Sequence, residues 1–371
     1  MKNQKSEILD LICNKYPNLP WLKTNIIYLV EHGSVAYGTN IEGSDIDYKS
    51  FCFPPKEYYF SFHQKFEQVQ LSAPEPDLVV YEIRKFFKLL AECNPSIIEV
   101  LFVDPSNIVI NTKLGEKILE HRQEFLSKKC RWTFGGYASS QIKRINLHRG
   151  YLLNPPTKEP TRKDFGLPEF TLIPQDQLAA AYAEIEKVLQ KYNLDFLDDL
   201  DESKKIGIHD TFHEILAEMK IYSDEKWNAA ARKIGCDENF IYLMSKEREY
   251  NARRREWDQY LNWKKNRNHV RAEMEAKFGF DGKHGLHLIR LLLTCKEMLD
   301  TGTVQVKRHD AEELKSIRNG AWSYEKLVEE SNKLLVQIDE SYKKSKLPNA
   351  PNINKLDQLC MEIIEEGLGF K

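Results

Sequence analysis

The sequence predicts an α+β fold, with a small head of mixed strands and helices followed by a mostly α-helical remainder. Strand-like and helix-like segments alternate through about residue 105. Beyond residue 114 the apolar positions recur with helical spacing almost throughout. We therefore expect two domains, residues 1–110 and residues 111–371, with a proline-rich connector at residues 154–170 inside the second.

The head is predicted to contain four strands. Each is a β-branched or apolar run bounded by Gly, Pro or other turn residues. The predicted strands cover residues 25–31, 46–53, 77–81 and 97–103. Helices are predicted at residues 6–16 and 83–93, and Asn94-Pro95 ends the second of them.

The remainder is predicted to form helices separated by short loops. The candidates cover residues 114–126, 136–149, 176–192, 209–221, 225–234, 246–275, 284–300 and 323–344. The connector, NPPTKEPTRKDFGLPEF, holds too many prolines for regular structure.

Composition limits the class of protein. With 42% hydrophobic and 30% charged residues the chain resembles a soluble globular protein, and no stretch reaches the ~18 apolar residues of a membrane helix. The N-terminus lacks the apolar run of a signal peptide, and the seven cysteines are scattered singly. We expect a cytoplasmic protein with no membrane partner. Because the net charge is −2, any nucleic-acid binding requires a local basic patch.

The stretch that carries chemistry is residues 32–47, HGSVAYGTNIEGSDID. Side chains alternate along a strand, so Asp45 and Asp47 should project from one face of the strand that they open. Two neighbouring carboxylates repel unless a cation lies between them, and an all-oxygen ligand set suits Mg²⁺ or Mn²⁺. Gly33 would let the backbone approach a phosphate, and Ser34 could donate to it at a helix N-terminus. The alternative, a tight turn followed by a capping pair, does not explain a charged pair at the start of an apolar strand.

A two-metal site needs a third carboxylate from a neighbouring strand. Asp77 and Glu82 are the candidates. Asp77 begins the strand DLVVY, whereas Glu82 has the opposite parity and lies where the next helix begins. We therefore select Asp77; its alternative role is that of a simple strand-opening residue after Pro76.

The chain resembles the RNA-repair-pathway DNA polymerase β family, a group of predicted nucleotidyltransferases associated with RNA ligase operons. The matching segments are HGSVAYGTNIEGSDIDYKSF, DLVVYEIRKFFKLLAECNPSIIEVLF, GYASSQIKR, NPPTKEPTRKDFGLPE, KHGLHLIRLLLTCKEMLDTGTVQV and IRNGAWSYEKL. The resemblance implies a polymerase-β-like nucleotidyltransferase palm followed by a helical domain, and an association with an RNA ligase pathway. It also implies metal ligation by Asp45, Asp47 and Asp77 and phosphate binding by Gly33 and Ser34.

Lys283, His287 and Arg290 lie at i, i+4 and i+7 on one face of a predicted helix. Such a cationic face could bind a nucleoside triphosphate (NTP) and neutralise the charge that moves toward pyrophosphate. A solvated basic edge with a hydrogen-bonded core histidine is the alternative.

Two basic stretches could bind RNA. Residues 128–164 hold nine Lys or Arg and two acids, and residues 246–271 form the second stretch. Cations interleaved with aromatic rings suit a nucleic-acid strand, although solvated basic helices with a core aromatic stripe have the same composition. The interleaved aromatic residues are Trp132, Phe134, Tyr137 and Tyr151, then Trp257, Tyr260 and Trp263.

The predicted activity is that of a metal-dependent nucleotidyltransferase. It would move a nucleoside monophosphate from an NTP to an acceptor hydroxyl, with RNA as the favoured acceptor and pyrophosphate as the product. One alternative is nucleotidylation of a small molecule or a protein side chain. Another is a catalytically silent protein that binds nucleotide or RNA.

Overall fold

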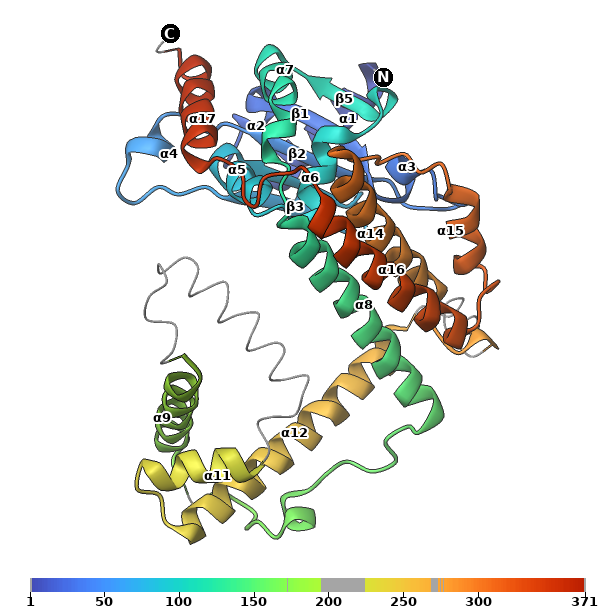
Figure 1. Ribbon diagram of the computed structural model, residues 1–371. Coiled ribbons are helices and arrows are strands. Elements are labelled where there is room, and N and C mark those ends of the chain that lie inside the picture. Colours follow the sequence, from blue (N-terminus) through green and yellow to red (C-terminus); the bar gives the residue numbers. More distant parts are fainter. Residues whose placement is uncertain are drawn as a thin grey trace. The chain divides into compact units, whose positions relative to one another are not determined.

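The computed structural model describes residues 2–171, 173–194, 224–267 and 277–369, together with Glu273 and Glu275. The helix predicted at residues 209–221 lies outside this part of the chain. The chain divides into two compact units, which are residues 1–153 with 268–371, and residues 154–267. Figure 1 shows the elements of both units.

The first unit is built on a five-stranded mixed sheet of order β3-β4-β2-β1-β5. Its strands are β1 (Ile26–His32), β2 (Asp47–Cys52), β3 (Gln68–Leu71), β4 (Leu78–Glu82) and β5 (Ile108–Asn111). The β2–β4 pair is parallel, and the other pairs are antiparallel. The coarse prediction of an α+β fold is therefore confirmed.

Three predicted strands are confirmed as β1, β2 and β4, and the helix predicted at residues 83–93 is α5 (Ile83–Ala91). The strand predicted at residues 97–103 is wrong. This segment forms α6 (Pro95–Ile98) and the 3-10 helix η1 (Glu99–Phe102). Pro95 occupies the first helical turn, where a missing N–H costs nothing, and the apolar residues after it are buried on all sides. A short run of this kind has no period that separates strand from helix.

The two faces of the sheet are covered by different helices. On one face Tyr28, Val30 and Phe51 join a large core with α5 and the C-terminal helices. On the other face Leu29 and Val80 pack with α1 (Lys2–Lys15) in a smaller core. The small helix α2 (Leu22–Asn25) leads from α1 into β1, α4 (Glu57–Phe60) lies between β2 and β3, and η2 (Pro105–Asn107) precedes β5.

Helices from both ends of the chain complete the larger core. α14 (Gly282–Thr301) packs against α8 (Cys130–Leu153), α15 (Ala311–Arg318) and α16 (Tyr324–Lys344), and α17 (Ile353–Gly367) packs against α5. α7 (Lys113–Glu120) and η3 (Arg122–Phe125) precede α8. The domain boundary expected near residue 110 therefore falls inside the first unit, because this core spans it. Helices α15 and α17 were not predicted.

The second unit is helical. It contains η4 (Arg162–Phe165), α9 (Gln175–Leu194), α11 (Asp224–Lys233) and α12 (Glu238–Asn266). Ile185, Trp227, Ile241 and Met244 form its core. η4 is the one helical turn within the proline-rich connector. Over the described residues of both units, no helix is long and apolar enough to cross a membrane.

Candidate active site

Asp47 and Asp77 are brought side by side by strand pairing. Asp47 opens β2 and Asp77 immediately precedes β4. The two strands are parallel and pair Tyr48 with Leu78, and the Tyr48 N–H donates to the Asp77 carbonyl at 2.7 Å. One step earlier on both strands come the two aspartates, which therefore share one face of strands about 4.8 Å apart.

Gly33 lies against the carboxylate of Asp47. β1 pairs antiparallel with β2 so that His32 is opposite Asp47, and Gly33 follows with φ +63°. A Cβ on Gly33 would lie 1.9 Å from Asp47 Oδ2. Glycine is required here twice, by the left-handed backbone and by the close approach of the carboxylate.

Ser34 lies in α3 (Gly33–Tyr37), directly after the end of β1. Its side chain is half-buried, and its hydroxyl makes no hydrogen bond within the described residues. The helix that begins here, α3, is only five residues long, so its dipole contributes little to binding a phosphate. Phosphate binding at this position would rest on the Ser34 hydroxyl and the neighbouring N–H groups.

Asp45 lies in the loop before β2 and is exposed. Together, Asp45, Asp47 and Asp77 place three carboxylates on two adjacent strand openings. Their carboxylate oxygens do not converge on one position for a metal ion, because they are not all within 4.8 Å of one another. The structure therefore gathers the predicted acidic set at one edge of the sheet in an open arrangement.

The electrostatics of Asp47 reflect this crowding. Burial raises the pKa of its carboxyl first, and the charges of Asp77 and Asp45 raise it further, while Lys283 and Lys49 oppose the shift. Repulsion among these carboxylates would be relieved by a divalent cation, which takes oxygen ligands. The donor set and the glycine contact therefore fit a Mg²⁺- or Mn²⁺-type ion.

Lys49 adds a cation that sequence analysis missed. It lies two residues after Asp47, so its side chain shares that face of β2. Burial lowers the pKa of its ammonium group, although Asp77, Asp47 and Glu99 act in the opposite direction. Its ammonium lies 5.8 Å from the centroid of the Tyr81 ring.

Glu82 has a different role from Asp77. It is buried at the end of β4 and caps α5, accepting a hydrogen bond from the Lys85 N–H at 3.0 Å. Its other oxygen accepts from Arg84 Nε at 2.9 Å. Glu82 is thus at the far end of β4 from Asp77, with both oxygens engaged.

The three cationic positions of α14 have separate environments. Lys283 is half-buried and close enough to Asp47 to affect the pKa of that carboxyl. Burial, reinforced by the charge of Arg290, lowers the pKa of His287 to about 3, so this histidine is neutral. Arg290 is buried in an ion pair with Glu99. Arg290 therefore lies in the core and not on the cationic, triphosphate-facing surface that helical spacing alone indicated.

Glu99 is the centre of a buried polar network behind the carboxylates. The Tyr37 hydroxyl donates to Glu99 Oε2 at 2.7 Å, and the guanidinium of Arg290 lies 3.7 Å from the centroid of the Tyr37 ring. His32 Nε2 is 3.9 Å from Glu99 Oε2, and burial lowers the pKa of His32 to about 3. The network fixes α3, which begins at Gly33, against η1 and α14. A lone acid in an apolar run was the available signal for Glu99.

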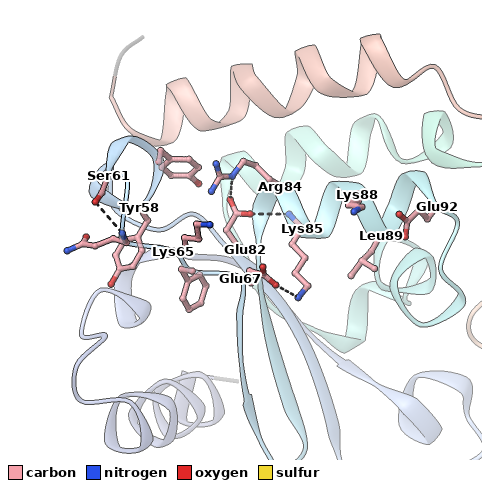
Figure 2. Close-up of a pocket in the computed structure, with 13 residues that line it drawn as sticks. Tyr58, Ser61, Lys65, Glu67, Glu82, Arg84, Lys85, Lys88, Leu89 and Glu92 are labelled. Atoms are coloured by element: carbon pink, nitrogen blue, oxygen red, sulfur yellow. Dashed lines mark hydrogen bonds and ion pairs between the residues drawn. The ribbon is translucent and has the colours of Figure 1, made fainter. Parts of the chain in front are cut away.

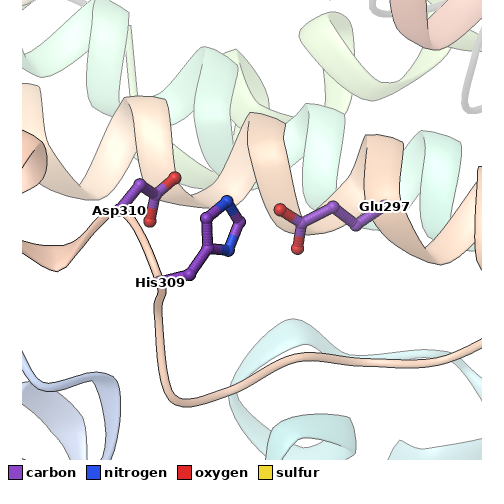
Figure 3. Close-up of side chains that lie close together, drawn as sticks. All are labelled: Glu297, His309 and Asp310. Atoms are coloured by element: carbon purple, nitrogen blue, oxygen red, sulfur yellow. The ribbon is translucent and has the colours of Figure 1, made fainter.

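A second acidic group lies elsewhere in the first unit. Glu297, His309 and Asp310 place ligand atoms within 4.8 Å of one another (Figure 3). Both carboxylates are already paired with Arg308, whose side chain is fully buried. Four charge-assisted hydrogen bonds join Arg308 to them. We interpret this group as a structural arginine clamp.

Much of the first basic stretch is engaged in structure. Arg131 pairs with Asp339 at 2.6 Å, Arg149 stacks 4.2 Å from the centroid of Tyr324, and Arg162 pairs with Glu247. Arg144 is exposed and forms no ion pair within the described residues. Of the interleaved rings, Phe134 and Tyr151 are buried, while Trp132 and Tyr137 are exposed.

The second basic stretch is likewise paired. Arg253 contacts Glu256 at 2.9 Å, and Arg254 contacts Glu159 and Asp258. Tyr260 is buried and touches the rings of Trp257 and Trp263. The exposed surface available to RNA is therefore smaller than the composition indicated.

Comparison with known proteins agrees with the resemblance seen in the sequence. The model of the RNA repair pathway DNA polymerase beta family matches residues 1–154. A relative from Bacillus subtilis (strain 168), the uncharacterized protein YcgL, is 36% identical over 84 residues, which cover 21% of this chain and 31% of that protein. No solved structure matches the chain. The matched residues include the whole sheet and all three aspartates.

Proposed function

We propose that this chain, whose residues 1–154 match the RNA repair pathway DNA polymerase beta family, is a metal-dependent nucleotidyltransferase with a polymerase-β-like palm. One observation carries the proposal. Asp47 lies in register with Asp77 on parallel strands and against the Cα of Gly33, so two carboxylates meet the Gly-Ser turn. A turn that could bind phosphate and a carboxylate pair that could bind a cation thus share one edge of the sheet.

Each residue has a distinct task in this proposal. Asp47 and Asp77, joined by the exposed Asp45, would hold the divalent cations. When bound, such cations lower the pKa of an attacking hydroxyl and neutralise the triphosphate. Gly33, which has no side chain, leaves room beside the turn for the Asp47 carboxylate. The Ser34 hydroxyl, which makes no hydrogen bond within the described residues, would donate to a phosphate oxygen.

Two cations complete the surroundings of the substrate. Burial raises the pKa of Asp47, and the charges of Lys283 and Lys49 oppose this rise, so both cations lie within electrostatic reach of that carboxylate. In this proposal they would also balance the charge of an incoming polyphosphate. The acceptor oxygen would bond to the α-phosphorus, and the bond from that phosphorus to the bridging oxygen would break. Pyrophosphate then leaves with that electron pair, and the acceptor proton passes to water.

RNA is the acceptor that we favour. The matched family is named for an RNA repair pathway, and the exposed Arg144, Trp132 and Tyr137 lie on α8 of the same unit. The alternative acceptors are a small molecule or a protein side chain. The alternative to an enzyme is a protein that binds nucleotide or RNA without catalysing a reaction.

The test is incubation of the protein with each α-labelled NTP, Mg²⁺ or Mn²⁺, and a pool of RNA. Label in RNA that disappears in Asp47→Asn would support the proposal. Label in the protein itself would identify a protein acceptor. No transfer with any of the four nucleotides and either metal would refute nucleotidyl transfer to RNA.

A further inference from the structure

A cavity of about 600 Å³ lies in the first unit between α5 and the segment Tyr58–Glu67, which runs from within α4 to the start of β3 (Figure 2). Glu82, at the end of β4, forms part of its wall. Asp77 precedes the same strand. The cavity and the acidic edge are therefore separated by the length of β4, which is about 17 Å for five residues. This cavity has no role in the nucleotidyl transfer described above.

Four cations and three carboxylates line the cavity, which leaves one positive charge in excess; the carboxylates are Glu67, Glu82 and Glu92. Arg84 pairs with Glu82 at 2.9 Å and Lys85 pairs with Glu67 at 2.8 Å. Lys65 and Lys88 form no ion pair within the described part of the chain, and both are exposed. In Figure 2 the ammonium end of Lys65 points between Tyr58 and Glu82, toward the cavity. After the hydrogen bond from Lys85, the charges of Lys65 and Lys88 also lower the pKa of Glu67, so both ammonium groups lie near this carboxylate. The excess positive charge favours an anionic ligand.

Aromatic side chains accompany these cations. The Tyr59 hydroxyl in the cavity wall is buried and has no hydrogen-bond partner among the residues that the structure describes. Such a group costs free energy unless a ligand or water bonds to it. On the same segment Phe62 is 95% exposed, and its ring centroid lies 5.0 Å from that of His63. An exposed phenyl ring offers a face on which a nucleic-acid base can stack.

We propose that this cavity, together with the exposed Phe62 on the segment that lines it, binds single-stranded RNA at a distance from the reacting end. Phosphodiesters would lie on Lys65 and Lys88, and a base would stack on Phe62. Cations that follow a backbone and rings that accept any base are the general means of binding a single strand. The inference rests on the proposed function, because it places part of the acceptor of that reaction.

The test measures binding of a fluorescent single-stranded RNA of 12 nucleotides to the full chain by anisotropy, without NTP, across a salt series. Removing two phosphate contacts in Lys65→Gln/Lys88→Gln should reduce the slope of log Kobs against log salt by about 1.4, since each contact in a single strand contributes about 0.7. Phe62→Ala should weaken binding about five-fold or more at fixed salt. Lys56→Gln, an exposed lysine just outside the cavity wall, is the matched control and should change neither value.

The outcomes separate the two proposals. Unchanged affinity and slope in the double variant, with a melting temperature equal to wild type, would overturn the RNA site and leave the cavity to another ligand class. A reduced slope together with no nucleotidyl transfer by the wild type would keep the RNA site and refute the proposed enzyme. Binding of double-stranded RNA that equals binding of the single strand would also contradict the inference, because paired bases cannot stack on Phe62.

Discussion

Breaking the buried ion pair between Glu99 and Arg290 should be strongly destabilising. The two side chains are 1% and 6% exposed, and they join residues 191 positions apart in the chain. Arg290→Met would leave the Glu99 carboxylate in the core with the Tyr37 hydroxyl as its main remaining partner. Removing one partner of a buried pair costs about 3–5 kcal/mol, because an uncompensated charge remains.

This loss should be measurable in two ways. Denaturant unfolding should give the change in free energy directly, and the melting temperature should fall by roughly 6–20 °C, since each 1 kcal/mol shifts it by about 2–4 °C in a domain of 150–250 residues. The double variant Arg290→Met/Glu99→Gln should recover most of the loss. It removes the stranded charge and keeps an acceptor for Tyr37.

The control lies on the same helix. Lys296 pairs with Asp300 at 2.7 Å, one turn apart, and their side chains are 33% and 38% exposed. Lys296→Met should cost less than about 1 kcal/mol, because an ion pair that solvent reaches contributes little. If Arg290→Met costs no more than this control, or if the double variant is as unstable as the sum of the single ones, the buried-charge reasoning is refuted.

Three further predictions concern the acidic edge. Asp47→Asn should abolish transfer, yet with a chelator present at pH 7 it should raise the free energy of unfolding, because the fold raises the pKa of this carboxyl. This gain in stability should vanish as the pH falls through the raised pKa. A loss of stability at pH 7 would contradict the reasoning. Asp77→Asn should reduce transfer far more than Glu82→Gln, and the reverse ranking in a labelled-NTP assay would exclude Asp77 as the third ligand. Gly33→Ala should cost about 1–2 kcal/mol through its left-handed backbone alone and also displace Asp47, so unfolding and transfer assays should both register it, and wild-type behaviour in both would contradict the contact.

The central strands could be predicted because their signals are local. β1, β2 and β4 are β-branched runs with clear stops, and the structure places Asp77 and Glu82 at opposite ends of β4. The edge strands β3 and β5 have four residues each, which is too short for a period to stand out. Local signals thus place each aspartate at the start of a strand, whereas the pairing of β2 with β4 brings Asp47 beside Asp77.

The surroundings of the site could not be predicted in the same way. Arg290 shares a helical face with Lys283, but its burial depends on Glu99, a residue from a distant 3-10 helix. Sequence analysis overlooked Lys49, because the sequence does not show which charged groups surround a lysine in the middle of a strand. Similarly, the basic stretches looked available for RNA until their acidic partners, such as Asp339 and Glu247, were located. Which cations are buried or paired depends on contacts between residues far apart in the chain, and the spacing of residues in the sequence does not reveal these contacts.

The first unit consists of two segments that are far apart in the chain, residues 1–153 and 268–371, and this affects its folding during synthesis. Residues of α14, α16 and α17 complete the core that also contains the sheet face bearing Tyr28 and Phe51. Those helices leave the ribosome after roughly 200 further residues, which takes about 10–40 s at the usual rates of synthesis. During that interval the nascent N-terminal segment would expose the apolar sheet face that these helices later cover, and such a surface is prone to aggregation.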